Sequence, residues 1–509
     1  MLSISKNNSR ISMLKTICLL VSSLPWKFGA YQRQAYTLSK ALTEYNIMWM
    51  PFAMSEPVKE RVYENIDSLY EQFDTIARPP EDFDHSHLTF VGLDSTDKVT
   101  SVSRLNRLAN EYGIDAYIMI GDIVKLIRDA DFAVPSVVWF PHHYNHLAPY
   151  ERFTLNAFGG IVSLSPSSSR MIADTLERPV TFIPHVVDVN TTAEPKHDTY
   201  TVLMQGGNYD KLDRKGWNIG LQAFRRFHEK YPDTHLYMHA ISSREIAQHS
   251  RNRKAPLGLK PEGLALEKLV DMYGLEPDSY TLDDTVHTFE KALSFKKRAH
   301  VCLHPSRVEG FGMNVLECQM VHTPVVTTNF TAMGDFTQYG ISVPYEQMDL
   351  FNDKELVAVP SVTGTAAALE RIYTSAESLE SFDPSPYTVE RVTNAFRSFL
   401  ANVSVPKEPI YSMATRENYT MSNTLWTILS DRPVRDRMMR VKLKTLPQNV
   451  LVAIIGESNP VDDEGYIHSN IPVAVRTHYL HRPFVIEKLL SVHALEPKNV
   501  VSLPSVFVR

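Results

Sequence analysis

Two glutamates, Glu309 and Glu317, stand eight positions apart in the chain, and a glycine-bracketed loop follows the first of them at residues 310–312. Such glycines let backbone amides approach a ligand closely, and the helix start behind the loop favours an anion. Carboxylates accept hydrogen bonds from hydroxyl groups. Phosphate-facing amides beside two such carboxylates suit a nucleotide sugar better than a bare nucleotide. The alternative is a helix N-terminus with ordinary capping acids.

The flanking residues predict how the two glutamates are positioned. Residues 299–304 form an apolar run typical of a buried strand, residues 314–321 have helical spacing, and residues 324–328 predict the next parallel strand. Open α/β sheets bind ligands outside the carboxyl ends of their strands. We therefore expect Glu309 on a loop at this edge and Glu317 about one turn into the helix.

The rest of the chain repeats this alternation of strands and helices. Right-handed crossovers between parallel strands are the usual result of such a pattern. A polar stretch at 190–199 separates two halves that each show it. The predicted strands lie at 15–21, 87–92, 116–121, 136–144, 160–165, 180–188, 200–207 and 235–240, before the central motif.

The sequence thus predicts an α/β protein with two doubly wound, Rossmann-like domains. The first covers residues 1–190 and the second residues 191–402, with residues 350–402 expected to form its C-terminal helices. Residues 403–509 form an α/β extension of unknown role, with a predicted strand at 449–456 and a helix around 485–493.

Three further positions lie where chemistry is expected. Paired histidines, His142 and His143, end the run at 136–144; the strand register slightly favours His142 but does not choose between them, and an interface role for both is the alternative. Arg214 and Lys215 precede a helix, and a solvated face is less natural there because cations are disfavoured near a helix N-terminus. Gly29 opens the helix after the first strand, as a plain turn residue can.

Together these residues resemble a known family. The segment P-S-x-x-E-G-F-G at 305–312, the L-E pair at 316–317 and the P-V-V run at 324–326 resemble the paired-glutamate motif of retaining glycosyltransferases of the GT-B fold. That large family includes many mannosyl- and glucosyltransferases. The resemblance covers roughly residues 15–400 and implies two Rossmann-like domains that face each other across a cleft.

The resemblance also implies a role for each candidate residue. Glu317 would accept hydrogen bonds from the ribose hydroxyls and Glu309 from those of the donor sugar, while His142 or His143 would touch that sugar from the opposite domain. The diphosphate and its surroundings would be contacted by Gly29, Arg214, Lys215, Gly310, Phe311, Gly312, Met313, Asn314 and Val315.

The chain departs from the family pattern at several of these places. Only one glycine, Gly29, stands where the family often has two, and the arginine that usually precedes Lys215 by several residues is replaced by Arg214. His322 stands where the family generally has glycine. A left-handed conformation would be strained for histidine, so we expect the local turn to differ. Asp335 stands where a glutamate is more usual.

Composition excludes other classes of protein. A net charge of −6 argues against a nucleic-acid partner, and no apolar run approaches the roughly 18 residues of a membrane span. The three cysteines lie in apolar segments without metal-ligand spacing, as expected of core residues in a reducing, cytoplasmic compartment. Residues 17–24 predict a first strand rather than a signal peptide. No Asp-x-Asp motif ends a strand, so we expect metal-independent catalysis with no cofactor beyond a nucleoside diphosphate sugar co-substrate.

The sequence therefore predicts a retaining hexosyltransferase that moves mannose or glucose from a nucleoside diphosphate sugar to a glycan, lipid-linked or protein acceptor. By resemblance, the acceptor attacks from the face that the diphosphate leaves, a phosphate oxygen takes the proton, and neither glutamate need be a covalent nucleophile. Two alternatives remain open. One is a GT-B scaffold that binds glycans or partners without turnover, and the other is a sugar-nucleotide epimerase.

Overall fold

The structure of the 509-residue chain is a computed structural model. It describes residues 14–26, 29–52, 59–70, 79–93, 100–123, 126–127, 130–147, 149–208, 212–240, 263–285, 287–351, 355–375 and 378–405, together with the C-terminal strands at 424–429, 439–442, 450–455, 466–469 and 500–501.

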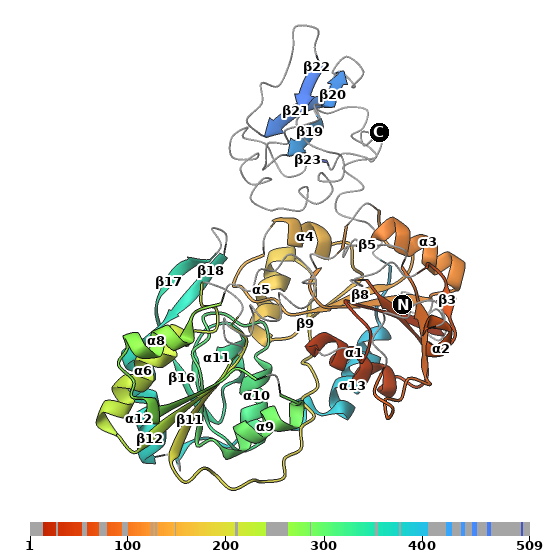
Figure 1. Cartoon of the computed structure of the whole chain (residues 1–509). Coiled ribbons are helices and arrows are strands. Elements are labelled where there is room, and N and C mark those ends of the chain that lie inside the picture. The colour runs from red at the N-terminus through yellow and green to blue at the C-terminus, as the bar shows by residue number, and fades with distance from the viewer. Residues whose placement is uncertain are drawn as a thin grey trace, which may run out of the picture.

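An eight-stranded sheet forms the centre of the first domain (Figure 1). Its order is β10-β9-β8-β6-β1-β2-β4-β3, and every pair is parallel except β3 with β4. The strands are β1 (Thr16–Val21), β2 (Asn46–Pro51), β3 (Val62–Tyr63), β4 (Leu88–Val91), β6 (Ala116–Ile120), β8 (Ser136–Phe140), β9 (Gly160–Ser163) and β10 (Thr181–Phe182).

Helices cover both faces of this sheet. Alternate residues of β1 pack into two separate apolar clusters, Ile17 and Leu19 into one and Cys18 and Leu20 into the other, as expected of a central parallel strand. The described helices here are α1 (Ala30–Ala41), α2 (Ile66–Tyr70), α3 (Val102–Tyr112), α4 (Pro149–Leu155) and α5 (Pro166–Leu176), and the short strands β5 (Thr100–Ser101) and β7 (Leu126–Ile127) pair beside them.

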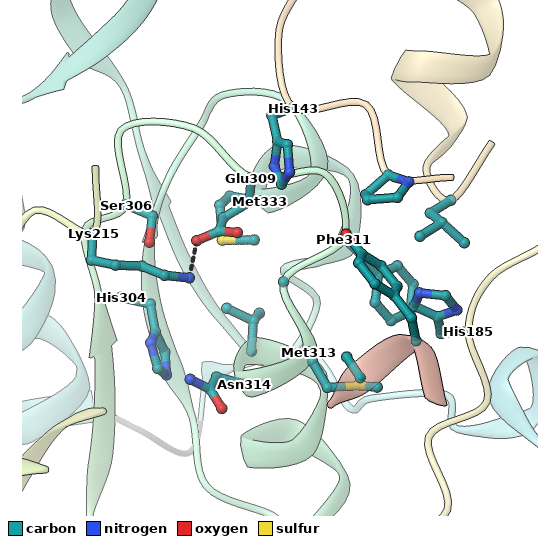
Figure 2. A pocket seen from close by; sticks show the side chains of 16 residues that line it. His143, His185, Lys215, His304, Ser306, Glu309, Phe311, Met313, Asn314 and Met333 are labelled. Atoms are coloured by element: carbon teal, nitrogen blue, oxygen red, sulfur yellow. Dashed lines mark hydrogen bonds and ion pairs between the residues drawn. The ribbon is translucent and has the colours of Figure 1, made fainter. Parts of the chain in front are cut away.

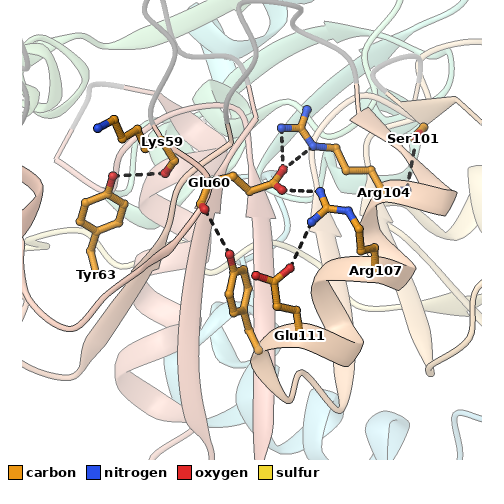
Figure 3. Close-up of polar contacts among 8 residues, drawn as sticks. Lys59, Glu60, Tyr63, Ser101, Arg104, Arg107 and Glu111 are labelled. Atoms are coloured by element: carbon orange, nitrogen blue, oxygen red, sulfur yellow. Dashed lines mark hydrogen bonds and ion pairs between the residues drawn. The ribbon is translucent and has the colours of Figure 1, made fainter.

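Glu60 joins the segment before β3 to helix α3 (Figure 3). Its carboxylate accepts a hydrogen bond from Arg104 Nε at 2.7 Å and also pairs with Arg107. Arg107 NH1 in turn lies 3.1 Å from Glu111, and the hydroxyl of Tyr112 donates to the Glu60 carbonyl oxygen. None of these residues lines the cavity described below, so the network positions the sheet edge and not the site.

A second, six-stranded sheet is parallel throughout, with the order β13-β12-β11-β14-β15-β16. Two doubly wound domains were predicted, and this arrangement confirms them. The strands are β11 (Tyr200–Gln205), β12 (Thr234–His239), β13 (Tyr280–Asp283), β14 (Val301–His304), β15 (Val325–Thr328) and β16 (Gly340–Val343). The described helices are α6 (Trp217–Lys230), α8 (Leu266–Met272), η3 (Pro277–Ser279), α9 (Phe289–Arg298), α10 (Met313–Met320), α11 (Ala332–Phe336), α12 (Val362–Ser375) and η5 (Ser385–Tyr387).

A β-hairpin follows β16 where the sequence predicted helices. Strands β17 (Tyr345–Phe351) and β18 (Glu355–Pro360) pair antiparallel, so the helical prediction is wrong for the first part of residues 350–402. The run E-L-V-A-V-P holds four consecutive apolar residues, and Val357 and Ala358 are buried against Val308. That short apolar run was the available signal for a strand.

The last helix, α13 (Val389–Leu400), returns to the first domain. Phe396 is buried and meets Trp139 of β8 edge to face, with ring centroids 4.7 Å apart. Arg397 pairs with Glu44 beyond α1, at 2.7 Å. Phe311, Leu316 and Phe336 of the second domain join the same apolar cluster, so a continuous core connects the two domains.

Beyond residue 405 the structure describes only strands. β21 (Val450–Ile455) confirms the predicted strand and pairs parallel with β19 (Thr424–Leu429), which also pairs with β23 (Val500–Val501). β20 (Met439–Lys442) pairs antiparallel with β22 (Tyr466–Ser469). The helix predicted around 485–493 lies outside the described residues. Among the described residues, every helix is too short or too polar to span a membrane.

Candidate active site

A cavity of about 220 Å³ lies between the two domains (Figure 2). The first domain contributes Ala30, Tyr31, Pro141, His143, Leu164 and the following His185. The second contributes Lys215, His304, Ser306, Glu309, Phe311, Gly312, Met313, Asn314, Val315 and Met333. Most of the predicted site residues therefore line one shared space at the carboxyl ends of the strands.

The centre of the polar wall is the carboxylate of Glu309, which is buried to 6% exposure. Its Oε1 pairs with the ammonium of Lys215 and its Oε2 lies 3.1 Å from Arg214 NH1. Burial alone would raise the pKa of Glu309, but the charges of Lys215 and Arg214 outweigh it and hold that pKa well below its usual range. Glu309 is therefore an anion held between two cations.

Backbone geometry at Gly216 places Lys215 against this carboxylate. Gly216 has φ 72°, and a Cβ there would lie 2.0 Å from the carbonyl oxygen of Pro305, so only glycine fits. Asp213 accepts hydrogen bonds from the amides of Trp217 and Asn218 at 2.7 and 2.9 Å and thereby caps α6. Arg214 does not line the cavity itself; it also donates to the Val308 carbonyl oxygen at 3.2 Å.

The loop at 305–312 ends in Gly312, the N-cap of α10. The predicted diphosphate amides ran from Phe311 to Val315. The amide of Val315 already donates to the Gly312 carbonyl oxygen at 2.9 Å, which takes it out of that set. Gly310 does not line the cavity. It packs closely against two residues that do, because a Cβ there would lie 2.7 Å from Pro141 Cβ and 3.2 Å from His143 Nδ1.

At the other end of α10, the backbone of His322 corrects an expectation. The sequence argument was that histidine would avoid a left-handed conformation, so that the turn would differ. His322 has φ 56°, in the left-handed region, and its amide donates to the Gln319 carbonyl oxygen at 3.1 Å. The helix thus ends in the usual left-handed way, with histidine bearing the strain that glycine would avoid.

The structure distinguishes the two histidines that follow β8. His143 lines the cavity, whereas His142 points away from it, with Nε2 at 2.8 Å from the His146 carbonyl oxygen and Nδ1 at 3.8 Å from Glu151. Burial lowers the pKa of His142 to about 4 and that of His143 to about 3. Both rings are neutral at neutral pH. The structure therefore favours His143 over His142 as the histidine that faces the cavity, the reverse of the slight preference from strand register.

Glu317 stands beside the cavity and does not line it. Its Oε2 accepts from Lys296 Nζ at 2.7 Å, and its Oε1 accepts from Arg33 NH2 of the first domain at 3.3 Å. Gly29 likewise begins α1 as predicted, but its neighbours Ala30 and Tyr31 are the residues that reach the cavity.

Several lining residues were not predicted as site residues. His185 lay within the strand predicted at 180–188, and His304 within the strand predicted at 299–304. His304 ends β14, so the rule that polar residues at strand ends mark sites could have found it. The predicted strand at 180–188 is limited in the structure to β10 (Thr181–Phe182), so the prediction placed His185 inside a strand and not beyond its end.

Two groups of side chains among the described residues have metal-ligand chemistry. Cys302, His304 and Cys318 are buried with their ligand atoms within 4.8 Å of one another, and so are the atoms of the half-buried His239, Asp283 and His287. Protein partners already engage the second group, since His239 pairs with Gln205 at 2.7 Å and His287 with Asp283 at 2.8 Å. In the first group, Cys318 Sγ lies 3.7 Å from His304 Nε2.

Comparison with known proteins then identifies the second domain. Residues 200–375 match the protein-family model described as glycosyl transferases group 1. Over these residues the second domain is similar to group 1 glycosyltransferases. The match spans Lys215, Glu309 and Glu317, and it confirms the predicted glycosyltransferase assignment. No curated protein shows significant sequence similarity to the chain.

Solved structures share the architecture around this glycosyltransferase domain. The E. coli trehalose-6-phosphate structure bound with UDP-2-fluoro glucose has a TM-score of 0.51 at 12% identity, covering 76% of this chain and 99% of that chain. The UDP-forming alpha,alpha-trehalose-phosphate synthase from Burkholderia vietnamiensis has a TM-score of 0.50 at 12% identity, covering 77% and 99%. At such identities the likeness establishes the fold, and the predicted GT-B fold is confirmed.

Proposed function

We propose that the protein transfers a hexose, glucose or mannose, from a nucleoside diphosphate sugar to a hydroxyl acceptor with retention of anomeric configuration. The observation that supports this most is the carboxylate of Glu309, paired with Lys215 and Arg214 on the wall of an interdomain cavity that also contains His143. Anion-binding cations and hydroxyl-accepting groups are thereby brought together, as a sugar diphosphate requires.

A uridine donor is the first candidate. The structural relative that was solved with UDP-2-fluoro glucose has the same fold over 76% of this chain. We infer that the diphosphate lies against the amides of Gly312, Met313 and Asn314 at the start of α10. The ribose hydroxyls would then reach Glu317, whose Oε1 is paired with the partly exposed Arg33.

The same arrangement supports a mechanism without a glutamate nucleophile. Cleavage of the glycosidic bond leaves negative charge on the diphosphate, and Lys215 with Arg214 would stabilise it. Glu309 is a poor nucleophile because two cations lower its basicity. It would accept hydrogen bonds from the donor sugar instead. The acceptor hydroxyl would attack from the face that the diphosphate leaves and pass its proton to a phosphate oxygen.

The acceptor is proposed to be a glycan, a lipid-linked sugar or a protein. Lys215 and Arg214 supply positive charge at the diphosphate, so we propose that the reaction needs no divalent cation. A cytoplasmic location, where nucleotide sugars are available, belongs to the same proposal.

Release of free nucleotide tests the function. The purified chain is incubated with UDP-glucose, GDP-mannose and related donors, and released nucleotide is measured for wild type, Glu309→Ala and Lys215→Ala. A matched control is Lys230→Ala, which removes a lysine whose exposed ion pair with Glu370 is remote from the cavity. The proposal expects loss in the first two variants and wild-type release in the control. Equal release from all four proteins would exclude it.

The alternatives give different products in the same experiment. A scaffold would bind the sugar nucleotide without releasing nucleotide, and an epimerase would convert the donor to an isomer without an acceptor. Mass spectrometry and NMR of the anomeric proton separate these outcomes from transfer with retention.

A further inference from the structure

His185 is a polar side chain inside an aromatic cage. It follows β10, lines the interdomain cavity and is 3% exposed. The ring of Trp139 meets it edge to face at 4.7 Å between centroids, and the ring of Phe311, from the other domain, does so at 5.1 Å. These contacts fix the imidazole at the junction of the two domains (Figure 2).

Nδ1 of His185 is buried and has no hydrogen-bond partner among the described residues. Burial lowers the pKa of His185 to about 3, so the ring is neutral and one nitrogen carries a proton. A buried donor or acceptor without a partner destabilises the folded protein. Such a group therefore calls for a partner that is not part of the chain.

Other buried histidines differ in this respect. His142 bonds to the carbonyl oxygen of His146, and His304 contacts Cys318. Within the described part of the chain, His143 shares the situation of His185: its Nδ1 is buried without a partner, and its ring lines the same cavity. Two unsatisfied imidazoles thus line the same cavity as Glu309 and Lys215, and His143 lies beside Glu309 (Figure 2).

We propose that His185 is a substrate-contacting residue that hydrogen-bonds a hydroxyl group of the donor sugar, alongside His143. This inference rests on the proposed function. A neutral imidazole has no charge for a phosphate, whereas a sugar hydroxyl both donates and accepts and so satisfies either tautomer. The diphosphate then lies toward Lys215, and the sugar lies toward the two histidines.

The test compares His185→Phe with wild type. Phenylalanine keeps the edge-to-face packing and removes the unsatisfied nitrogens. Affinities for UDP-glucose, GDP-mannose, UDP and GDP are measured by calorimetry, and stability by thermal unfolding without ligand. We expect His185→Phe to lower the affinity for the sugar nucleotide that wild type binds by about tenfold. The affinity for the matching nucleotide should stay unchanged within about twofold. The variant without ligand is expected to be at least as stable as wild type.

A matched control and a partial rescue sharpen the comparison. His300 contacts Tyr200 through a stacked ring, but its Nδ1 accepts a hydrogen bond from the amide of Thr201 at 3.0 Å, and it is remote from the cavity. His300→Phe should therefore lower stability and leave sugar-nucleotide affinity unchanged. His185→Asn restores a hydrogen-bonding atom near the position of Nδ1 and should recover part of the lost affinity.

The outcomes separate this inference from the proposed function. If wild type binds none of the four probes, both are contradicted. If wild type prefers a sugar nucleotide but His185→Phe binds it equally well and is less stable, His185 is a structural residue and only this inference fails. If His185→Phe lowers the affinities for UDP and UDP-glucose equally, or those for GDP and GDP-mannose equally, a contact with the sugar is also contradicted.

Discussion

Arg33 of α1 and Glu317 of α10 form an ion pair between the two domains, with NH2 and Oε1 3.3 Å apart. The two cations at this carboxylate differ in their surroundings. Lys296 is as buried as Glu317, at 3% and 4% side-chain exposure, whereas Arg33 is 40% exposed and lies over the ring of Phe289 at 4.3 Å. Lys296 therefore compensates the buried charge, and Arg33 is the exchangeable partner.

The first prediction compares the removal of each cation. Arg33→Ala should change the free energy of unfolding by less than about 1 kcal/mol, because a partly exposed ion pair is screened by solvent. Lys296→Met should cost about 3–5 kcal/mol, because it leaves Glu317 buried without its main counter-charge. Urea unfolding of both variants measures the difference, and the double replacement Lys296→Met with Glu317→Leu should recover most of the loss. Equal destabilisation by the two single variants would contradict the distinction.

The second prediction concerns the stability of the protein at acidic pH. His142, His143 and His185 have folded-state pKa values of about 4, 3 and 3, lowered by burial from an ordinary 6.5. Between pH 6.5 and these folded-state pKa values the unfolded chain binds more protons than the folded chain. The contribution of the three neutral histidines to stability is therefore complete above pH 6.5 and is lost as the pH falls. Each histidine should lower the free energy of unfolding by about 2 kcal/mol between pH 7 and pH 5.

Unfolding free energies at pH 7 and pH 5 check this, with His185→Phe as the comparison. That variant should lose about 2 kcal/mol less than wild type over the interval. Glu309 does not interfere, because its lowered pKa affects stability only below its ordinary value of 4.5. The same loss in both proteins would mean that His185 is protonated in the folded state.

The sequence was sufficient for the fold and for most of the polar wall, because both depend on local patterns. Runs of apolar residues predicted the parallel strands, the glycines at 310–312 predicted the loop, and the helical spacing of residues 314–321 predicted α10. The predicted extent of the second domain included α13, yet that helix packs on Trp139 of the first domain. Its apolar face indicated burial but not which sheet would cover it.

The remaining errors concern relationships between distant residues. Nothing local in the sequence reveals that Glu317 pairs with Arg33, 284 positions away, or that His143 and not His142 faces Glu309. His185 was overlooked because a contact with Phe311 exists only once the two domains close on each other. Residue types suggested which positions to consider, and only the packing of the domains showed which member of each pair lines the cavity.

The third prediction concerns the two cations beside Glu309. Lys215→Ala should lower nucleotide release by about 10²–10³-fold, as expected for the loss of a group that stabilises developing charge. Arg214→Ala should have a smaller effect, because Arg214 does not line the cavity and also bonds the Val308 carbonyl oxygen. Steady-state nucleotide release from a saturating donor measures both. A larger loss with Arg214→Ala would assign the leaving group to Arg214 instead.

The fourth prediction uses the strained backbone at His322. A non-glycine residue in the left-handed region destabilises the folded state by roughly 1–2 kcal/mol, which glycine would relieve. Glycine also has more conformational freedom in the unfolded chain, which offsets about 0.4–1 kcal/mol of that relief. His322→Gly should therefore raise the free energy of unfolding by about 0.5–1 kcal/mol. His322 is exposed and lies outside the cavity, so nucleotide release should not change.

Gly113 supplies the reciprocal test in the first domain. It ends α3 at φ 65°, and a Cβ there would have no atom within 4 Å, so Gly113→Ala adds backbone strain without a steric clash. It should lower the free energy of unfolding by about 1 kcal/mol, the opposite sign to His322→Gly. Measuring both by urea unfolding tests the left-handed conformation as the cause, because both residues have positive φ and the two replacements change the backbone strain in opposite directions. If both variants shifted stability in the same direction, backbone strain would not be what limits stability at these helix ends.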